Sequence, residues 1–265
     1  MLLLIPVPVV LAGLGCGASL READEKGYSV TARQNYERGV EKLEDDDWLE
    51  ATKYFTFVKA RFPFSKYAVL AELRLADTAF ASGSHLEAID AYRQFYRAHP
   101  THTHVLDGYT AFRTCEAQHK LVPSSWFIFP PDYEMDLSPA YDLLRELDSF
   151  IQQYPASRFR KRAVDLRTKC AHLLAAHEWY VANFYWARNQ PMGTVLRLRA
   201  LLTKYPGVGY DEDALWLLGK AYVKAGRLED ARTTWQSLIT KHPKHKRALE
   251  VEKELATLGA ESHGR

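Results

Sequence analysis

Glycine is scarce in this chain, and neither sign of charge is in excess. Only 14 of the 265 residues are glycine, a composition typical of neither a disordered chain nor an all-β fold. Lys and Arg total 35 against 33 Asp and Glu, and without a surplus of cations no nucleic-acid partner is predicted. The sequence also lacks a Gly-rich phosphate loop, an HExxH motif and a nucleophile elbow, so we predict no catalytic residue and no cofactor.

The first 15 residues carry no charge and form an apolar run shorter than the roughly 20 residues that span a bilayer. Such a run is typical of a signal peptide. It ends in small residues directly before Cys16, which resembles the lipobox of bacterial lipoproteins, so we predict a lipid anchor at Cys16 and a polar tether over residues 16–28. The residue after Cys16 is Gly rather than Asp, and this favours the outer membrane as the location of the anchored protein. The alternative is a secretory signal before an incidental cysteine.

Two further cysteines, Cys115 and Cys170, fall among apolar residues of predicted helices. An oxidising compartment would allow them to form a disulfide. No Cys-x-x-Cys pair is present, and two buried thiols that pack as small hydrophobic groups are the favoured interpretation.

An aromatic or histidine residue followed by proline recurs along the chain, with prolines 37, 55, 51 and 37 residues apart. A tetratricopeptide repeat has a period of about 34 residues, in which two helices end at a proline. The two spacings of 37 residues are close to this period, and the two longer spacings match it if the repeat contains an insertion. The steps are Phe62-Pro63, His99-Pro100, Tyr154-Pro155, Tyr205-Pro206 and His242-Pro243.

Small residues recur inside three of these repeats, where two helices are expected to cross closely and an aromatic side chain to fill the space beside them. The small residues of the first helices are Gly39, Ala76 and Gly219; those of the second helices are Ala51, Ala88 and Ala231, each followed four positions later by Phe55, Tyr92 or Trp235. Asp47, Ser84 and Ser138 are expected N-caps of second helices. Gly83 and Gly226 are expected left-handed residues in the turns.

The sequence thus predicts an all-α, tetratricopeptide-like α-α superhelix of five helical hairpins plus a C-terminal capping helix. The hairpins are expected over residues 31–63, 66–100, 105–155, 157–206 and 211–243, and the cap over 246–258, with a frayed tail after it. The third hairpin carries an apolar, proline-rich loop at 121–137. Residues 158–189 hold no proline or glycine and predict one long helix, whose aromatic second half is expected to be buried on several sides.

These residues resemble the BamD family of outer-membrane β-barrel assembly lipoproteins over most of the chain. The markers are residues 61–67 (RFPFSKY), 99–102 (HPTH) and 180–185 (YVANFY), Val195-Leu196-Arg197, Lys204-Tyr205-Pro206 and the loop in the third hairpin. The resemblance implies a lipid-anchored scaffold on the periplasmic face of the outer membrane. It implies a BamA-like partner, held through its POTRA region, unfolded outer-membrane protein clients, and other assembly lipoproteins as further partners.

By that resemblance residues 29–155 form the client side and residues 156–265 the BamA side. Phe64 and Tyr67 would lie near the client end, and Arg197 near the BamA contact. The other candidate client-binding residues are Arg74, Tyr109 and Arg113, on the first helices that line the concave surface of a repeat array. Alternatively, these aromatic residues belong to the core between repeats and the arginines are merely solvated.

Trp126, Phe127 and Phe129, in the loop of the third hairpin, are candidate partner contacts, or they fold back onto their own hairpin. His99, His102 and His104 match no established zinc spacing, so no metal site is predicted. The alternative function is an adaptor lipoprotein for a secretin, a pilus or another cell-envelope complex. An enzyme that carries repeats is disfavoured, because the repeats consume almost the whole chain.

Overall fold

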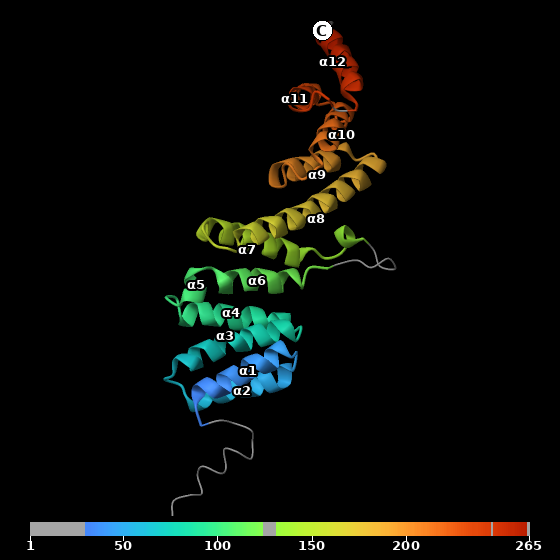
Figure 1. Cartoon of the computed structure of the whole chain (residues 1–265). Helices are drawn as coiled ribbons and strands as arrows, with labels where there is room; N and C mark the ends of the chain where they lie inside the picture. The colour runs from blue at the N-terminus through green and yellow to red at the C-terminus, as the bar shows by residue number, and fades with distance from the viewer. Residues whose placement is uncertain (1–29, 124–130, 245, 264–265) are drawn as a thin grey trace, which may run out of the picture. The chain divides into compact units, whose positions relative to one another are not determined.

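The computed structural model describes residues 30–123, 131–244 and 246–263, which are helical and contain no strand (Figure 1). The predicted all-α, tetratricopeptide-like fold is confirmed. The helices are α1 Ala32–Glu44, α2 Trp48–Arg61, α3 Lys66–Ala81, α4 His85–Ala98, α5 Thr103–Leu106, α6 Tyr109–His119, the 3-10 helix η2 Asp132–Glu134, α7 Ser138–Gln153, α8 Arg160–Ala187, α9 Pro191–Lys204, α10 Asp211–Lys224, α11 Leu228–Lys241 and α12 Ala248–His263.

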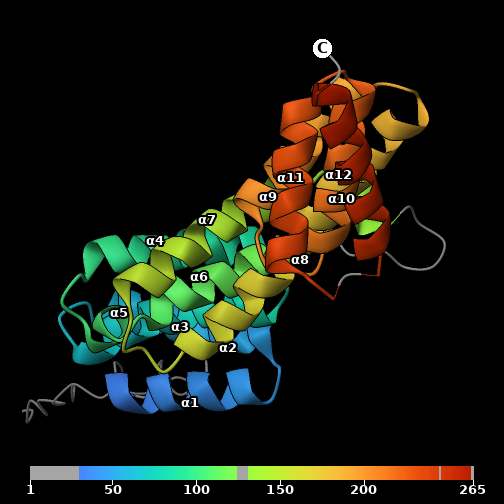
Figure 2. The same ribbon diagram turned by 90° about the horizontal axis from the view of Figure 1, so that it is seen from above.

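Neighbours in the sequence are neighbours in space. Helix α1 packs on α2, α6 on α7, α8 on α9 and α10 on α11, and each hairpin from α6 onward also contacts the next. Figure 2 shows α10, α11 and α12 side by side at the C-terminal end. Within each unit, apolar side chains of successive helices are buried against each other, as a repeat protein requires.

Proline ends the second helices as predicted. Phe62, Tyr154, Tyr205 and His242 each precede a proline, leave the helical conformation and still donate their N–H to the carbonyl four residues back. A residue before proline is pushed out of the α region, so the helix stops there. Tyr205 is buried, so its ring adds to the core where the helix stops.

The close crossings are confirmed in the first and last hairpins. A Cβ on Gly39 would lie 2.7 Å from Cε1 of Phe55, and a Cβ on Gly219 would overlap the indole of Trp235. Both aromatic rings are fully buried. The left-handed conformation predicted for Gly83 and Gly226 is also present.

Two helix ends differ from the prediction. Ser138 is the first residue of α7 rather than its N-cap, and the Asp136 carboxylate accepts from its N–H and hydroxyl at 2.9 and 2.7 Å. Helix α12 continues to His263, through the stretch expected to fray. The Asp136 carboxylate thus satisfies the N–H of Ser138, one of the N–H groups at the start of a helix that have no partner within it.

Helix α8, the long central helix in Figure 1, is unbroken over 28 residues as predicted. The expectation that its aromatic half is buried on several sides is wrong for one face. Tyr180 and Phe184 are 39 and 42% exposed, because they lie one turn apart on the same side of the helix. Ala182 is fully buried.

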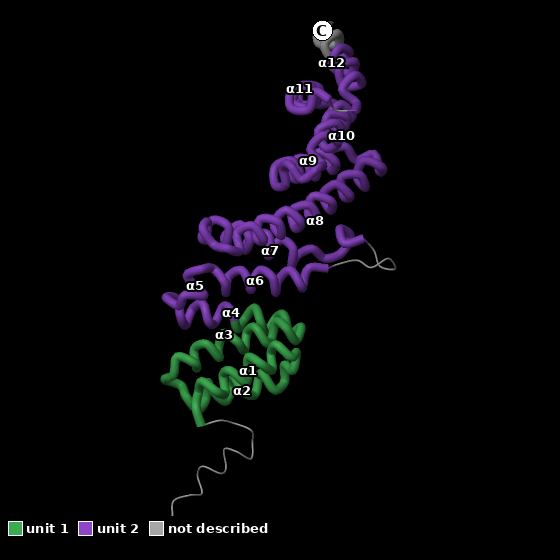
Figure 3. The backbone as a smooth tube through the Cα atoms, in the orientation of Figure 1, with its two compact units in different colours: residues 1–91 green, residues 92–265 purple. Residues whose placement is uncertain are grey.

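The chain divides into two compact units between Ala91 and Tyr92, within α4 (Figure 3). The core of the first is built around Ala51, Phe55, Val58 and Ala71. The core of the second runs from Phe112 to Val251 and holds both described cysteines as free, buried thiols. The division of function at residue 155 stays a prediction. Within the described residues, no helix is both long and apolar enough to cross a membrane.

Candidate binding surfaces

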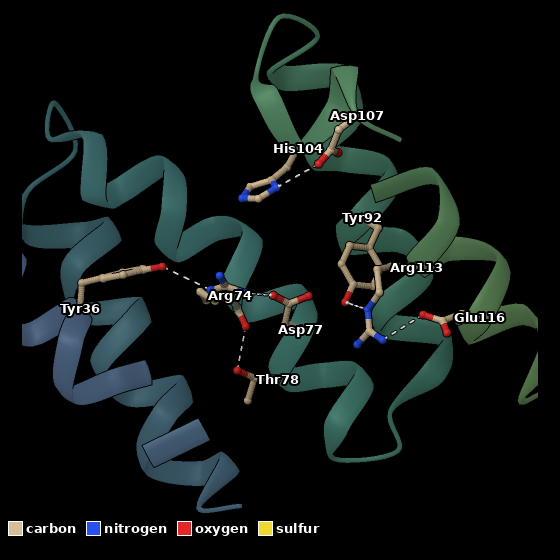
Figure 4. Close-up of polar contacts among 9 residues, drawn as sticks. All are labelled: Tyr36, Arg74, Asp77, Thr78, Tyr92, His104, Asp107, Arg113 and Glu116. Carbon is tan, nitrogen blue, oxygen red and sulfur yellow. Dashed lines mark hydrogen bonds and ion pairs between the residues drawn. The ribbon is translucent and has the colours of Figure 1, made fainter. Parts of the chain in front are cut away.

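In the first unit, two candidate client-binding residues meet at a tyrosine that sequence reasoning missed. The ring of Tyr36, on α1, lies 5.5 Å from the ring of Tyr67 between centroids. The hydroxyl of Tyr36 accepts a hydrogen bond from Nε of Arg74 at 3.2 Å (Figure 4). Tyr67 and Arg74 therefore belong to one cluster on α1 and α3.

Arg74 is also paired with an acidic residue one turn further along α3. Its Nη1 lies 2.6 Å from Oδ2 of Asp77, a side chain that is only 7% exposed. Burial by itself would lower the pKa of Arg74, but the hydrogen bond to Tyr36 and the charge of Asp77 outweigh it and leave that pKa raised. The guanidinium is thus held in place as a permanent charge and is not a free surface group.

Phe64 lies in the turn between α2 and α3, and its side chain is fully exposed. Single exposed hydrophobic residues are common on protein surfaces, so the role of Phe64 as a client contact stays a prediction.

The second unit repeats this arrangement around Tyr92. Nε of Arg113 donates to the Tyr92 hydroxyl at 3.2 Å, and its Nη1 donates to Oε2 of Glu116 at 3.1 Å (Figure 4). The ring of Tyr109 meets that of Tyr92 edge-on at 6.5 Å. Glu116 also binds Arg162 from α8, so one carboxylate serves two arginines.

The spacing of these residues would have revealed the pattern. Arg74 and Arg113 each precede an acidic residue by three positions and a small, buried residue by two, namely Ala76 and Cys115. Residues three apart share a helix face, so each arginine pairs with its acid on that face. No sequence signal identifies Tyr36, because it comes from another helix.

Arg197, the predicted BamA contact, lies on α9 and pairs with a buried carboxylate of α8. Its Nη1 is 3.3 Å from Oε2 of Glu178, whose side chain is 4% exposed, whereas that of Arg197 is 36% exposed. Tyr141 and Tyr205 hydrogen-bond to each other nearby, and burial raises the pKa of both. Arg197 therefore neutralises a buried charge in its own core, with one edge left to solvent.

Helix α9 also carries a groove of about 440 Å³ near its exposed side. Met192 and Leu196, one turn apart, are 52 and 68% exposed at this groove. Arg199, Lys204 and Arg227 line it as well, and Arg227 is paired with Asp230 at 2.6 Å. Among the described residues that line the groove, exposed apolar side chains thus stand together with cations.

Some predicted sites receive no structural description. Cys16, Trp126, Phe127 and Phe129 lie outside the described residues. In the segments that the structure does describe, no group of three or more metal-ligating side chains comes together. His102 instead caps α5, where its Nδ1 accepts from the N–H of His104 at 3.2 Å.

Successive helical hairpins with small residues facing buried aromatic rings define an all-α repeat protein of the tetratricopeptide type. The family model described as "YfiO: Outer membrane lipoprotein" matches residues 29–238, and the chain belongs to this family. The resemblance seen in the sequence is thereby confirmed.

Curated relatives extend this finding. The chain is 26% identical over 215 residues to "Outer membrane protein assembly factor BamD" of Neisseria meningitidis serogroup A, covering 79% of this chain and 78% of that protein. It is 25% identical over 232 residues to the protein of the same name from Xylella fastidiosa strain 9a5c, covering 87 and 78%. A solved "TPR2AB-domain:pHSP90-complex of yeast Sti1" is 13% identical with a TM-score of 0.42, covering 87 and 84%, too distant to carry an argument.

Proposed function

We propose that this protein is a non-catalytic scaffold of outer-membrane β-barrel protein assembly. The observation that supports this most is the family match across residues 29–238, joined to relatives that bear the name of an assembly factor. On this proposal the chain is anchored by a lipid at Cys16 on the periplasmic face of the outer membrane. It binds a BamA-like protein and the signals of unfolded clients.

The proposed partner surface is the exposed side of α9. Leu196 supplies an apolar anchor at the groove, and Arg199 supplies positive charge. Arg197 neighbours both in sequence and keeps an exposed edge, so it would contribute a bond at the rim. Exposed apolar groups ringed by charge are the usual composition of a protein interface.

Each unit carries its own proposed client-binding residues, namely Phe64, Tyr67 and Arg74 in the first unit and Tyr109 and Arg113 in the second. The arginines are held in position by tyrosine and carboxylate, so little side-chain entropy is lost when they donate to a peptide backbone or carboxylate. Phe64 offers a fully exposed ring to an apolar side chain of the client.

Co-purification from detergent-solubilised membranes tests the partner. A tagged chain is expected to recover a POTRA-containing barrel protein, and Leu196→Glu should reduce that recovery at least tenfold. A carboxylate at position 196 removes the apolar anchor and reverses the complementarity. Leu249→Glu, on α12, is the matched control, since Leu249 is also highly exposed at 75%.

Charge reversal at Arg197 is a poor test, because it would place a second carboxylate beside buried Glu178 and destabilise the core. Arg197→Lys keeps the charge and removes only the planar donor pair. Recovery of a secretin or pilus component in place of the POTRA protein would overturn the proposal and support the adaptor alternative.

A further inference from the structure

A pocket of about 210 Å³ lies in the second unit among α4, α6 and α7. Its lining from α6 includes Thr110, Ala111 and Thr114. Successive residues of a helix are about 100° apart around its axis. On α6 the mean direction of Tyr109, Arg113 and Glu116 is therefore about half a turn away from that of these three lining residues. The pocket therefore opens on another face of α6, but it shares Tyr92 with the proposed client residues, because Tyr92 lines the pocket and its hydroxyl accepts from Nε of Arg113.

The inner wall of the pocket is apolar, with one polar group left unsatisfied. Phe150 and Cys115 line it and are 2 and 0% exposed. Thr110 is 1% exposed, and its hydroxyl has no hydrogen-bond partner within the described chain. An apolar side chain in the pocket would leave this hydroxyl as it is, so the inner wall favours such a side chain through the apolar contacts that Phe150 and Cys115 offer.

The mouth of the pocket carries both donors and acceptors. The guanidinium of Arg93 faces the carboxylate of Glu146 at 3.5 Å, and both side chains are about 40% exposed. Nε2 of Gln153 donates to the hydroxyl of Tyr96 at 3.3 Å. The two charges cancel, and this disfavours a phosphate or a nucleic acid, whereas alternating donors and acceptors match the N–H and C=O groups of a peptide backbone.

The volume of the pocket limits how large a part of a ligand can enter it. About 210 Å³ is below the 300–1,000 Å³ typical of small-molecule sites, but it accommodates one large apolar side chain. We propose that this pocket binds an extended, uncharged segment of a partner polypeptide through a single leucine or aromatic side chain, with the backbone held by Arg93, Glu146 and Gln153. This second peptide site is independent of the proposed assembly function.

Photo-crosslinking of the full chain tests the site. The probe is a biotinylated, end-blocked pentapeptide with photo-leucine at its centre and glycines on both sides, used at up to 1 mM. Crosslinks mapped by mass spectrometry are expected on pocket residues of α4, α6 and α7. The same peptide with central Leu or Phe should compete at least tenfold better than that with Ala.

Ser149→Phe places a ring at the mouth of the pocket from an exposed position of α7, and it should reduce crosslinking at least tenfold. Thr168→Phe, at an exposed position of α8, is the matched control and should have no effect. Gln153→Ala, a milder change that keeps the core intact, should weaken labelling several-fold.

Crosslinks that map elsewhere would overturn the site, as would equal competition by the Ala peptide, unchanged labelling of Ser149→Phe or no labelling at 1 mM. The co-purification at Leu196 reports on a different helix. Failure of one experiment is therefore distinguishable from failure of the other.

Discussion

At the scale of single residues, arginines in this protein are fixed by pairs of partners. Arg74 and Arg113 each hold a tyrosine hydroxyl and a carboxylate three positions on, while Arg197 neutralises buried Glu178. Removing such an arginine would leave a poorly solvated carboxylate, an effect on stability that is easily mistaken for lost binding. Substitutions that retain the positive charge distinguish a loss of binding from a loss of stability.

Gly219→Ala is the sharpest residue-scale prediction. An added Cβ would overlap the indole of Trp235, which is 1% exposed and donates to the carbonyl of Trp216 at 3.1 Å. Overpacking of this kind costs about 1–3 kcal/mol, more than alanine gains from helix propensity. Urea denaturation should show a lower midpoint with an unchanged slope.

A second variant checks the cause. In a Trp235→Phe background the smaller ring leaves room for the methyl group, so Gly219→Ala should cost less than it does in the native chain. Equal costs in both backgrounds would show that the indole does not set the limit at this position.

At the scale of elements, the short helix α5 depends on a histidine. His102 Nδ1 can accept from the N–H of His104 only while that nitrogen carries no proton. Burial and then the charges of His104 and His99 lower the pKa of His102 from 6.5, against the opposing charge of Asp107. The start of α5 is thus sensitive to mild acid.

The pH dependence follows from the sign of this shift. Because the folded state holds its proton less tightly than the unfolded state, the contribution of His102 to stability is full above pH 6.5 and is lost as the pH falls through the lower, folded pKa. The melting temperature should therefore fall between pH 7.5 and 5.5. The melting temperature of the His102→Asn variant, which keeps a cap acceptor, should fall less over the same pH range.

His119 is expected to supply part of the remaining slope, since burial and then Lys120 and Lys169 lower its pKa as well. Melting curves for the native chain and His102→Asn, recorded in parallel at both pH values, make the comparison. An identical fall in the two proteins would show that His102 does not titrate with folding.

At the scale of the whole molecule, the proposed lipid anchor at Cys16 would set where the protein works. On the proposed lipid anchor, Cys16→Ser should abolish incorporation of labelled palmitate and move the protein from the membrane to the soluble fraction, because the acyl chains supply the membrane affinity. Cys170→Ala, which removes a buried thiol, is the matched control and should retain the label. Labelling of Cys16→Ser would contradict the lipobox prediction.

The sequence by itself determined the repeat architecture, because proline stops, small residues at crossings and aromatic residues four positions later act within one hairpin. Only the tertiary structure decided which side chains the candidate site residues contact. Tyr36 reaches Arg74, Glu178 reaches Arg197 and Tyr96 reaches Gln153 across separate helices. Such pairs depend on how helices stack, and a periodic pattern along one helix carries no information about the side chain opposite.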